Sequence, residues 1–481
     1  MVHTTLLRSG YKIKKSELSI KELKEIKKDL TANPFVVGDF GNGNEKRFSL
    51  YMESPNSLYI PRFYAWSRFG PPDINKMDEG QAIDLKFAGS LRKEQNPIID
   101  LYTKACSERG GGLISLKCGG GKTVLALYLV SMLKKKTIVI VHKDFLMTQW
   151  RDRIQQFLPD ARIGKIQQNT IDIEDKDIVL AMVQSLSQKE YDPEVFSSFG
   201  LAIFDECHHL GAEVFSKSMA KVSSKYMLGL SATPDRKDGL RKVFEWYIGP
   251  MVYSSKDDKN KDYIETRIYE YYDEDKQYSK LELLYNKKPC MPRMINNISY
   301  HMPRCQFIND IIKQEYENGR KILVLGDRRE YLNTTEKWIR ENIGDIVGQY
   351  VGGLKPSELR DSQEKDIILG TFSMASEGMD IPKLNTIVLA SPKSDVVQSV
   401  GRILREKANV RTHHPLIIDF KDTHPNLGMF SKQCEKRIKY YKKCDHEIHY
   451  YQMNGEKEKI EKRQMKKKAT EVYEIGECLI D

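Results

Sequence analysis

The sequence predicts an α/β protein whose two main parts are doubly wound parallel sheets. One observation behind this prediction is that short apolar runs alternate with helical patterns in two blocks of the chain. The other is that these runs are rich in β-branched residues, as is typical of parallel strands buried on both faces. The expected strands are Leu113–Leu116, Thr137–Val141, Asp177–Met182, Leu201–Phe204 and Tyr226–Leu230 in the first block, and Lys321–Leu325, Asp366–Thr371, Thr386–Ala390 and Pro415–Asp419 in the second.

Five parts follow from this pattern. A small accessory domain precedes the first lobe, a charged, tyrosine-rich connector or insertion separates the lobes, and a helical extension follows the second lobe. The expected boundaries, in that order, are residues 1–85, 86–250, 251–305, 306–430 and 431–481.

The parts outside the two lobes carry weaker signals. The first part is expected to hold a charged helix over Lys14–Leu30 and an aromatic-rich strand over Leu58–Tyr64. Its basic and aromatic residues suit stacking on nucleic-acid bases, although a small domain with an aromatic core explains them equally well. A helical element is expected near Tyr278–Tyr285, and a solvated, lysine-rich helix near the C-terminus.

The composition of the chain limits the classes of function and the cellular setting to be considered. The 481 residues carry a formal net charge of +10, which favours polyanionic partners or simply soluble surfaces. The eight cysteines include no C-x-x-C pair and are expected to be reduced thiols. The first 15 residues contain no apolar signal region, and no apolar run approaches 18 residues. We therefore expect neither secretion nor a membrane span.

A glycine-rich loop follows the first expected strand. Gly119, Gly120 and Gly121 precede Lys122 and Thr123, which open a helical pattern. Backbone N–H groups of such a loop can surround phosphate oxygens at a helix N-terminus. Lys122 would then neutralise the β- and γ-phosphates, and the Thr123 hydroxyl would bind magnesium. Leu116 replaces the first glycine of the strict P-loop pattern, and a flexible linker is the alternative interpretation.

Polar residues also follow two other expected strands. Asp205 and Glu206 come directly after Leu201–Phe204, where Asp205 can hold magnesium and Glu206 can orient the attacking water. His208, Ser231 and Thr233 lie at the same kind of strand end, and they are candidates for coupling this site to the other lobe.

The second lobe supplies arginines. The spacing of Gln398, Arg402 and Arg405 predicts that they lie near one face of a helix. Guanidinium groups suit the phosphoryl oxygens of a transition state, although paired arginines on a helix are usually solvated. Gly378 and Asp380 follow another strand and could line the ribose of the nucleotide.

Taken in order, these motifs resemble those of the superfamily 2 helicases and translocases over roughly Leu91–Phe420. The stretches similar to the XPB and phage UvsW branch are Cys118–Thr123, Gln149-Trp150, Asp205–His208, Ser231–Arg236 and Gln398–Arg405. Ile60–Tyr64 and Gly326–Glu330 resemble the helicases of large cytoplasmic DNA viruses, including the poxvirus transcript-release factor. The resemblance implies two RecA-like lobes that bind ATP and Mg²⁺.

The resemblance also implies further contacts. Arg92 and Gln95 would belong to the segment that reads adenine, although Glu94 stands where relatives often have tyrosine. Arg236 would belong to an element that separates the duplex, and Lys143 and Thr371 would touch nucleic-acid phosphates without regard to sequence.

The predicted function is therefore an ATP-dependent helicase or translocase. The resemblance favours DNA over RNA, travel from 3′ to 5′, and a role in transcription or repair such as viral transcript release, with transcription machinery as a partner. The cytoplasm, or the host cytoplasm or virion for a viral protein, is the expected location, with the nucleus as the alternative. An ATP-gated clamp or remodelling scaffold with little unwinding is the alternative function, and a small-molecule P-loop kinase would leave the second lobe unexplained.

Overall fold

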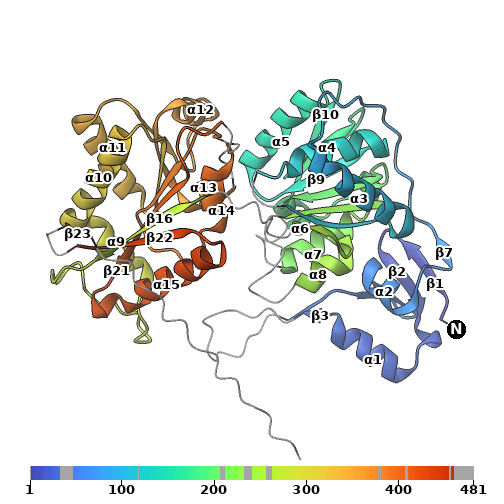
Figure 1. Cartoon of the computed structure of the whole chain (residues 1–481). Coiled ribbons are helices and arrows are strands. Elements are labelled where there is room, and N and C mark those ends of the chain that lie inside the picture. The colour runs from blue at the N-terminus through green and yellow to red at the C-terminus, as the bar shows by residue number, and fades with distance from the viewer. Residues whose placement is uncertain are drawn as a thin grey trace, which may run out of the picture. The chain divides into compact units, whose positions relative to one another are not determined.

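The computed structural model describes most of the chain and divides it into two compact units, Met1–Lys259 and Asn260–Asp481 (Figure 1). Each unit is built around one large, mainly parallel sheet. The described residues are 2–32, 47–116, 119–205, 212–231, 241–255, 263–377, 379, 381–406, 410–453 and 457–459.

The sheet of the first unit confirms all five strands expected in the first block. Its strand order is β11-β10-β12-β9-β13-β14-β8-β15, and every pairing except that of β11 is parallel. The bounds are β8 Gly111–Ser115, β9 Thr137–Val141, β10 Ile163–Gln167, β11 Thr170–Asp172, β12 Ile178–Met182, β13 Leu201–Asp205, β14 Tyr226–Ser231 and β15 Met251–Ser254.

Helices cover both faces of this sheet, because side chains alternate along its buried strands. Ile138 and Ile140 of β9 face one hydrophobic cluster with α6, α7 and α8. Val139 and Val141 face the other cluster with α3, α4 and α5. The bounds are α3 Asn96–Arg109, α4 Lys122–Leu133, α5 Asp144–Phe157, α6 Val183–Gln188, α7 Ala212–Lys221 and α8 Arg241–Ile248.

The N-terminal region packs on the α6–α8 face of the same sheet. It contains a five-stranded sheet of order β5-β6-β2-β1-β7, a two-stranded β3–β4 pair, and helices α1 and α2. Its buried residues, such as Leu6 and Tyr11, belong to the same cluster as Ile138 of the large sheet. The bounds are β1 Thr4–Leu7, β2 Gly10–Lys14, α1 Ile20–Asp29, β3 Thr31–Ala32, β4 Phe48–Ser49, β5 Met52–Glu53, β6 Ser57–Ile60, α2 Arg62–Phe69 and β7 Ile74–Asn75.

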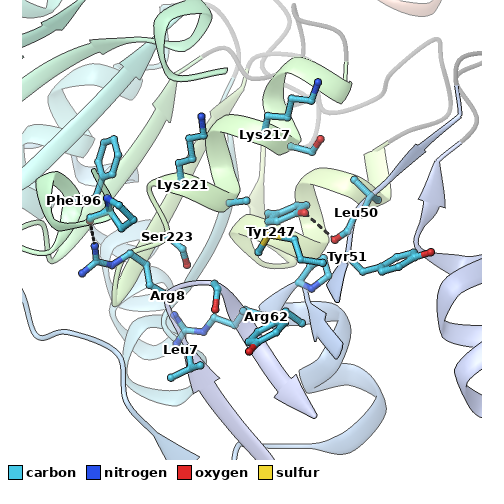
Figure 2. A pocket seen from close by; sticks show the side chains of 18 of the residues that line it. Leu7, Arg8, Leu50, Tyr51, Arg62, Phe196, Lys217, Lys221, Ser223 and Tyr247 are labelled. Carbon is cyan, nitrogen blue, oxygen red and sulfur yellow. Dashed lines mark hydrogen bonds between the residues drawn. The ribbon is translucent and has the colours of Figure 1, made fainter. Parts of the chain in front are cut away.

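Polar contacts reinforce this shared core around a cavity of about 720 Å³ (Figure 2). The Tyr247 hydroxyl donates to Leu50 O at 2.9 Å, and Arg8 Nη1 donates to Pro193 O at 2.5 Å. Arg62 of α2 donates to Lys225 O at 2.9 Å, and burial lowers the pKa of Arg62 to about 10. The N-terminal region and the large sheet are therefore parts of one packed unit.

One expected element of this region is wrong in its second half. The strand expected over Leu58–Tyr64 ends at Ile60, and α2 begins at Arg62. Pro61 lies between them with φ −55°, and its ring removes the N–H that would continue the strand ladder.

The sheet of the second unit confirms the four strands expected in the second block. Its order is β18-β19-β17-β20-β21-β16-β22-β23, with only β23 antiparallel. The strands are β16 Glu265–Tyr271, β17 Ile322–Gly326, β18 Val347–Tyr350, β19 Ile367–Thr371, β20 Thr386–Leu389, β21 Leu416–Asp422, β22 Glu447–Met453 and β23 Lys457–Lys459. The helices are α9 Met291–Tyr300, α10 Met302–Glu317, α11 Arg329–Asn342, α12 Pro356–Glu364, α13 Phe372–Glu377, α14 Val397–Val400 and α15 Gly428–Lys443.

The segment expected to be a connector contributes to both sheets. β15 pairs with β8 in the first unit, and β16 lies between β21 and β22 in the second. The helix expected near Tyr278–Tyr285 is wrong, because turns and a bridge between Leu283 and Pro289 occupy this stretch. Of the helical extension expected over 431–481, α15 covers the part up to Lys443 and packs with one side buried, and the chain then returns as β22 beside β16. Residues 460–481 lie outside the described residues.

No helix within the described ranges is both long and apolar enough to span a membrane.

Candidate nucleotide-binding site

The candidate site lies at the carboxyl edge of the first unit's sheet, where three neighbouring strands end. β13 ends at Asp205, β14 at Ser231 and β8 at Ser115. Ser231 is opposite Ser115 in the register, and Asp205 is opposite Leu230. The Leu116 N–H also donates to Ser231 O at 3.0 Å. The fold therefore brings Asp205 and Ser231 to the strand that leads into the glycine loop.

The glycine loop opens α4, as its sequence predicts. Lys122 is the first residue of this helix, and the Leu125 N–H donates to Gly121 O at 3.0 Å. Gly119 and Gly121 each have φ of +75°, a left-handed conformation that glycine adopts without strain. A Cβ at Gly121 would also lie only 2.6 Å from Gln95 Nε2. Glycine therefore suits this position by its backbone angle, and a side chain there would also displace the Gln95 amide.

Two residues just before α3, Arg92 and Gln95, hold this loop. Arg92 Nη1 donates to Gly119 O at 3.0 Å. Gln95 Nε2 lies within hydrogen-bond distance of Gly120 O (3.2 Å) and Gly121 O (3.3 Å). Gln95 Oε1 accepts from the Arg92 N–H at 2.9 Å, and the side chain is buried. Both ends of the Gln95 amide are thus bonded within the chain, and recognition of adenine by Arg92 and Gln95 stays a prediction.

Asp205 has a partner that sequence reasoning did not assign. The indole Nε1–H of Trp150, from α5, donates to Asp205 Oδ2 at 2.8 Å. Both residues are buried, with 1% of Trp150 and 7% of Asp205 exposed. This hydrogen bond fixes the orientation of the carboxylate. In the sequence, Gln149-Trp150 is part of the resemblance to the helicase family, but no function follows from it for Trp150.

The donor set at this edge fits a magnesium–nucleotide complex. The Thr123 hydroxyl and the Asp205 carboxylate are hard oxygen ligands, which Mg²⁺ prefers. Backbone N–H groups at the start of α4 and the ammonium group of Lys122 suit phosphate oxygens. When bound, Mg²⁺ would neutralise charge on the phosphates.

The arginine-bearing segment of the second unit differs from its expected form. α14 ends at Val400, and a 3₁₀ turn covers Gly401–Leu404, so Arg405 caps that turn. Residues i and i+3 of a 3₁₀ turn lie on one face, so the turn keeps Arg402 and Arg405 on the same side, whereas Gln398 belongs to the preceding α14.

The two arginines nevertheless share surroundings within the second unit. Arg402 is 6% exposed, and its Nη1 donates to Met379 O at 2.7 Å. Burial raises the pKa of Tyr350, and the charges of Arg402 and Arg405 oppose this effect. Both guanidinium groups therefore act on the same tyrosine at the end of β18.

The remaining predicted residues fall into two groups. Lys143 caps the N-terminus of α5 just beyond β9, and Thr371 ends β19 with its hydroxyl 3.3 Å from Ser373 Oγ. Both lie at or just beyond strand ends, and their contact with a nucleic-acid backbone stays a prediction. Glu206, His208, Thr233, Arg236, Gly378 and Asp380 lie outside the described residues.

Comparisons with known proteins agree with this architecture. The family described as "Type III restriction enzyme, res subunit" matches residues 88–236, and the "Helicase conserved C-terminal domain" matches residues 304–407. A "Putative ATP-dependent RNA helicase" of Acanthamoeba polyphaga mimivirus is 37% identical over 98% of this chain and 93% of its own length. A protein of African swine fever virus with the same description is 25% identical over 73% of this chain and 72% of its own.

One solved structure supports the fold alone. An ATP-dependent type ISP restriction-modification enzyme, LlaBIII bound to DNA, matches 77% of this chain and 32% of its own with a TM-score of 0.51 and 14% identity. Two RecA-like parallel sheets, the first with a phosphate-binding loop, define a two-lobed P-loop nucleoside triphosphatase. The chain belongs to the superfamily 2 helicases, and the relatives it matches over most of its length are viral proteins described as ATP-dependent helicases.

Proposed function

We propose that this protein is a motor that couples ATP hydrolysis to movement along a nucleic-acid strand. The observation that supports this most is the meeting of the glycine loop, Asp205 and Ser231 at one sheet edge in a member of a helicase family. Each of the two RecA-like sheets carries a different part of the expected machinery.

The first unit binds the triphosphate in this proposal. Lys122 neutralises the terminal phosphates, and Thr123 and Asp205 hold Mg²⁺. Asp205 keeps its orientation through the indole of Trp150. Glu206 positions the water that attacks the γ-phosphate.

The second unit supplies Arg402 and Arg405 to the γ-phosphate when the two units close on ATP. Arginines in comparable sites contribute about 10³–10⁵ in rate. A strand that contacts both units would favour the closed state, and hydrolysis would therefore depend on nucleic acid. His208, Ser231 and Thr233 would relay the nucleotide state between the units.

The proposed track is the sugar–phosphate backbone, with DNA as the first substrate. Lys143 and Thr371, at strand ends, would contact phosphates and would not read sequence. The resemblance to the XPB branch favours DNA, whereas the names of the viral relatives say RNA. The substrate assay must therefore contain both.

Strand displacement on 3′-tailed and 5′-tailed DNA and RNA duplexes tests this proposal, with ATP hydrolysis measured on the same substrates. We expect slow hydrolysis by the protein alone, strong stimulation by DNA, and displacement of 3′-tailed DNA. Lys122→Ala should abolish hydrolysis, and Arg405→Ala should remove most of the stimulation while ATP still binds. Rapid hydrolysis that neither DNA nor RNA changes would refute the motor.

The same assay separates the proposed motor from a clamp. A clamp would show ATP-dependent binding to nucleic acid with little turnover and no displacement. Efficient displacement of RNA but not DNA would retain the motor and reverse the proposed substrate.

A further inference from the structure

The loop between β20 and α14, residues 390–396, leads directly into the segment with Arg402 and Arg405. Three groups from other parts of the second unit hold this loop. Arg304 Nη1 donates to Ala390 O at 2.9 Å, and the Asp327 N–H donates to Ser391 Oγ at 3.1 Å. Arg437 Nη1 donates to Lys393 O. The start of the arginine segment is thus fixed from three directions.

The two arginines that hold the loop use the same arrangement. Arg437 of α15 donates from Nε and Nη2 to the two oxygens of Asp419, at 2.8 and 2.7 Å. Arg304 of α10 donates from Nε and Nη2 to the two oxygens of Asp422, at 2.8 and 3.1 Å. In each case the third nitrogen, Nη1, is left for a loop carbonyl. Both aspartates belong to β21.

These ion pairs are fully enclosed within the second unit. Arg437 and Arg304 are each 1% exposed, and Asp419 and Asp422 are equally buried. Burial alone would lower the pKa of Arg437, but Asp419 raises it above its ordinary value. Replacing such a pair with apolar residues is often neutral or stabilising. A contribution to fold stability is therefore a weak explanation for two such pairs directed at one loop.

The loop also contacts the expected nucleic-acid side of the unit. Lys393 Nζ lies 5.5 Å from the ring centre of Phe372, which begins α13 immediately after Thr371. The residue whose carbonyl Arg437 holds is therefore in contact with the neighbour of a predicted phosphate contact.

We propose that Arg437 and Arg304 are positioning residues for hydrolysis. Their fixed guanidinium groups hold the β20–α14 loop in place, and the loop in turn positions Arg402 and Arg405 relative to the nucleotide. This inference rests on the proposed function of those two arginines. It assigns α15 a role in the rate of hydrolysis.

The test is Arg437→Lys in the full-length protein. Lysine keeps a positive charge beside Asp419 but cannot also reach Lys393 O with a rigid fork. We expect kcat of nucleic-acid-stimulated hydrolysis to fall by about tenfold or more, since small displacements of reacting groups are costly, while KM for ATP stays near that of the wild type. Ser391→Ala should also lower kcat, by a smaller factor than Arg437→Lys. If Arg437→Lys does not fold, the kcat of Ser391→Ala tests the proposal instead.

Tyr441→Phe is the matched control. The Tyr441 hydroxyl donates to Asp419 Oδ2 at 3.0 Å, in the same buried cluster, and this bond does not involve the loop. It should lower thermal stability without lowering kcat. Folded Arg437→Lys and Ser391→Ala proteins with wild-type kcat would overturn the proposal, as would an equal loss of kcat in Tyr441→Phe. Arg402→Ala, measured in parallel, tests the proposed function separately, because wild-type hydrolysis by that variant would refute the role of the arginines themselves.

Discussion

Trp150 shows how one side chain can prepare the carboxylate at the candidate site. Its indole donates to Asp205 from a position 55 residues earlier in the chain, and both groups are buried. Trp150→Phe keeps most of the packing but removes the donor. Loss of such a bond costs about 1–3 kcal/mol when the acceptor is buried.

We expect Trp150→Phe to require more Mg²⁺ for half-maximal hydrolysis and to hydrolyse ATP more slowly at saturation. The measurement is ATP hydrolysis over a magnesium titration, with thermal unfolding to check the fold. An unchanged magnesium dependence would show that the indole only packs against Asp205.

His446 gives the second unit a defined sensitivity to acid. Its Nδ1 lies 3.1 Å from Thr266 Oγ1, its ring stacks on Tyr441, and burial lowers its pKa to about 4. A histidine in the unfolded chain has a pKa of about 6.5, so the unfolded state takes up the proton first as the pH falls. This contribution to stability is complete above about pH 6.5 and is lost progressively down to about pH 4.

Denaturant unfolding of the wild type and of His446→Gln at neutral and at mildly acidic pH measures this effect. The free energy of unfolding should decrease less on acidification in the variant. If both proteins lose the same amount, His446 is not the responsible group.

At the scale of the element, the glycine loop depends on a backbone conformation that other residues adopt only with strain. Gly121→Ala would place a methyl group 2.6 Å from Gln95 Nε2 at a φ of +75°. Strain of roughly 1–3 kcal/mol is expected for such a residue, equivalent to about 5- to 150-fold in ATP affinity if ATP binding requires this loop conformation. Fluorescent-nucleotide binding measures this change.

Gly70→Ala is the matched control for this prediction. Gly70 also has a positive φ, +83°, but a Cβ there would meet no atom within 4 Å. This variant should lose some stability and keep its ATP affinity. Equal ATP affinities for Gly121→Ala and the wild type would contradict the proposed fit of the loop.

Local sequence patterns predicted the buried parallel strands well, because a strand covered on both faces must be continuously apolar. They failed for β16, whose alternating charged residues suggested a connector. Arg267 of β16 pairs with Glu265 and with Glu315 of α10, a residue 48 positions away. Local patterns do not reveal such a distant partner.

The candidate site likewise has parts that local sequence patterns predict and parts that they do not. The glycine loop and Asp205 were predictable, because strand ends and helix starts are local features. The donation from Trp150 to Asp205, and the 3₁₀ turn at Gly401–Leu404, depend on tertiary packing. Sequence therefore predicted the chemical groups but not the contacts that orient them.

At the scale of the whole molecule, binding through sequence-independent phosphate contacts predicts that the affinity for nucleic acid depends strongly on salt concentration. Each phosphate contact releases counterions, so log affinity should fall with log salt by about 0.7 per contact on single strands. Lys143→Ala should weaken binding to all sequences and reduce the size of this slope by about 0.7, the value for one contact. Fluorescence anisotropy over a salt series provides the measurement.

Lys337→Ala is the control for the salt series. Lys337 is an exposed lysine of α11 paired with Glu341 one helical turn away, so its loss removes the same charge elsewhere. The control should keep the wild-type slope. Tight binding of one short nucleic-acid sequence at high salt would contradict the prediction that the protein binds without regard to sequence.

The shared core of the N-terminal region and the ATP-binding sheet has a mechanical consequence. Because Leu6 and Tyr11 pack in the same cluster as Ile138, the described part of the first 85 residues shares its hydrophobic core with the large sheet and would lose part of that core if it were cut away. The N-terminal region and the glycine loop therefore belong to one packed unit and should move together. A probe on the exposed Ile20 position of α1 would therefore report on movement of the first unit as a whole.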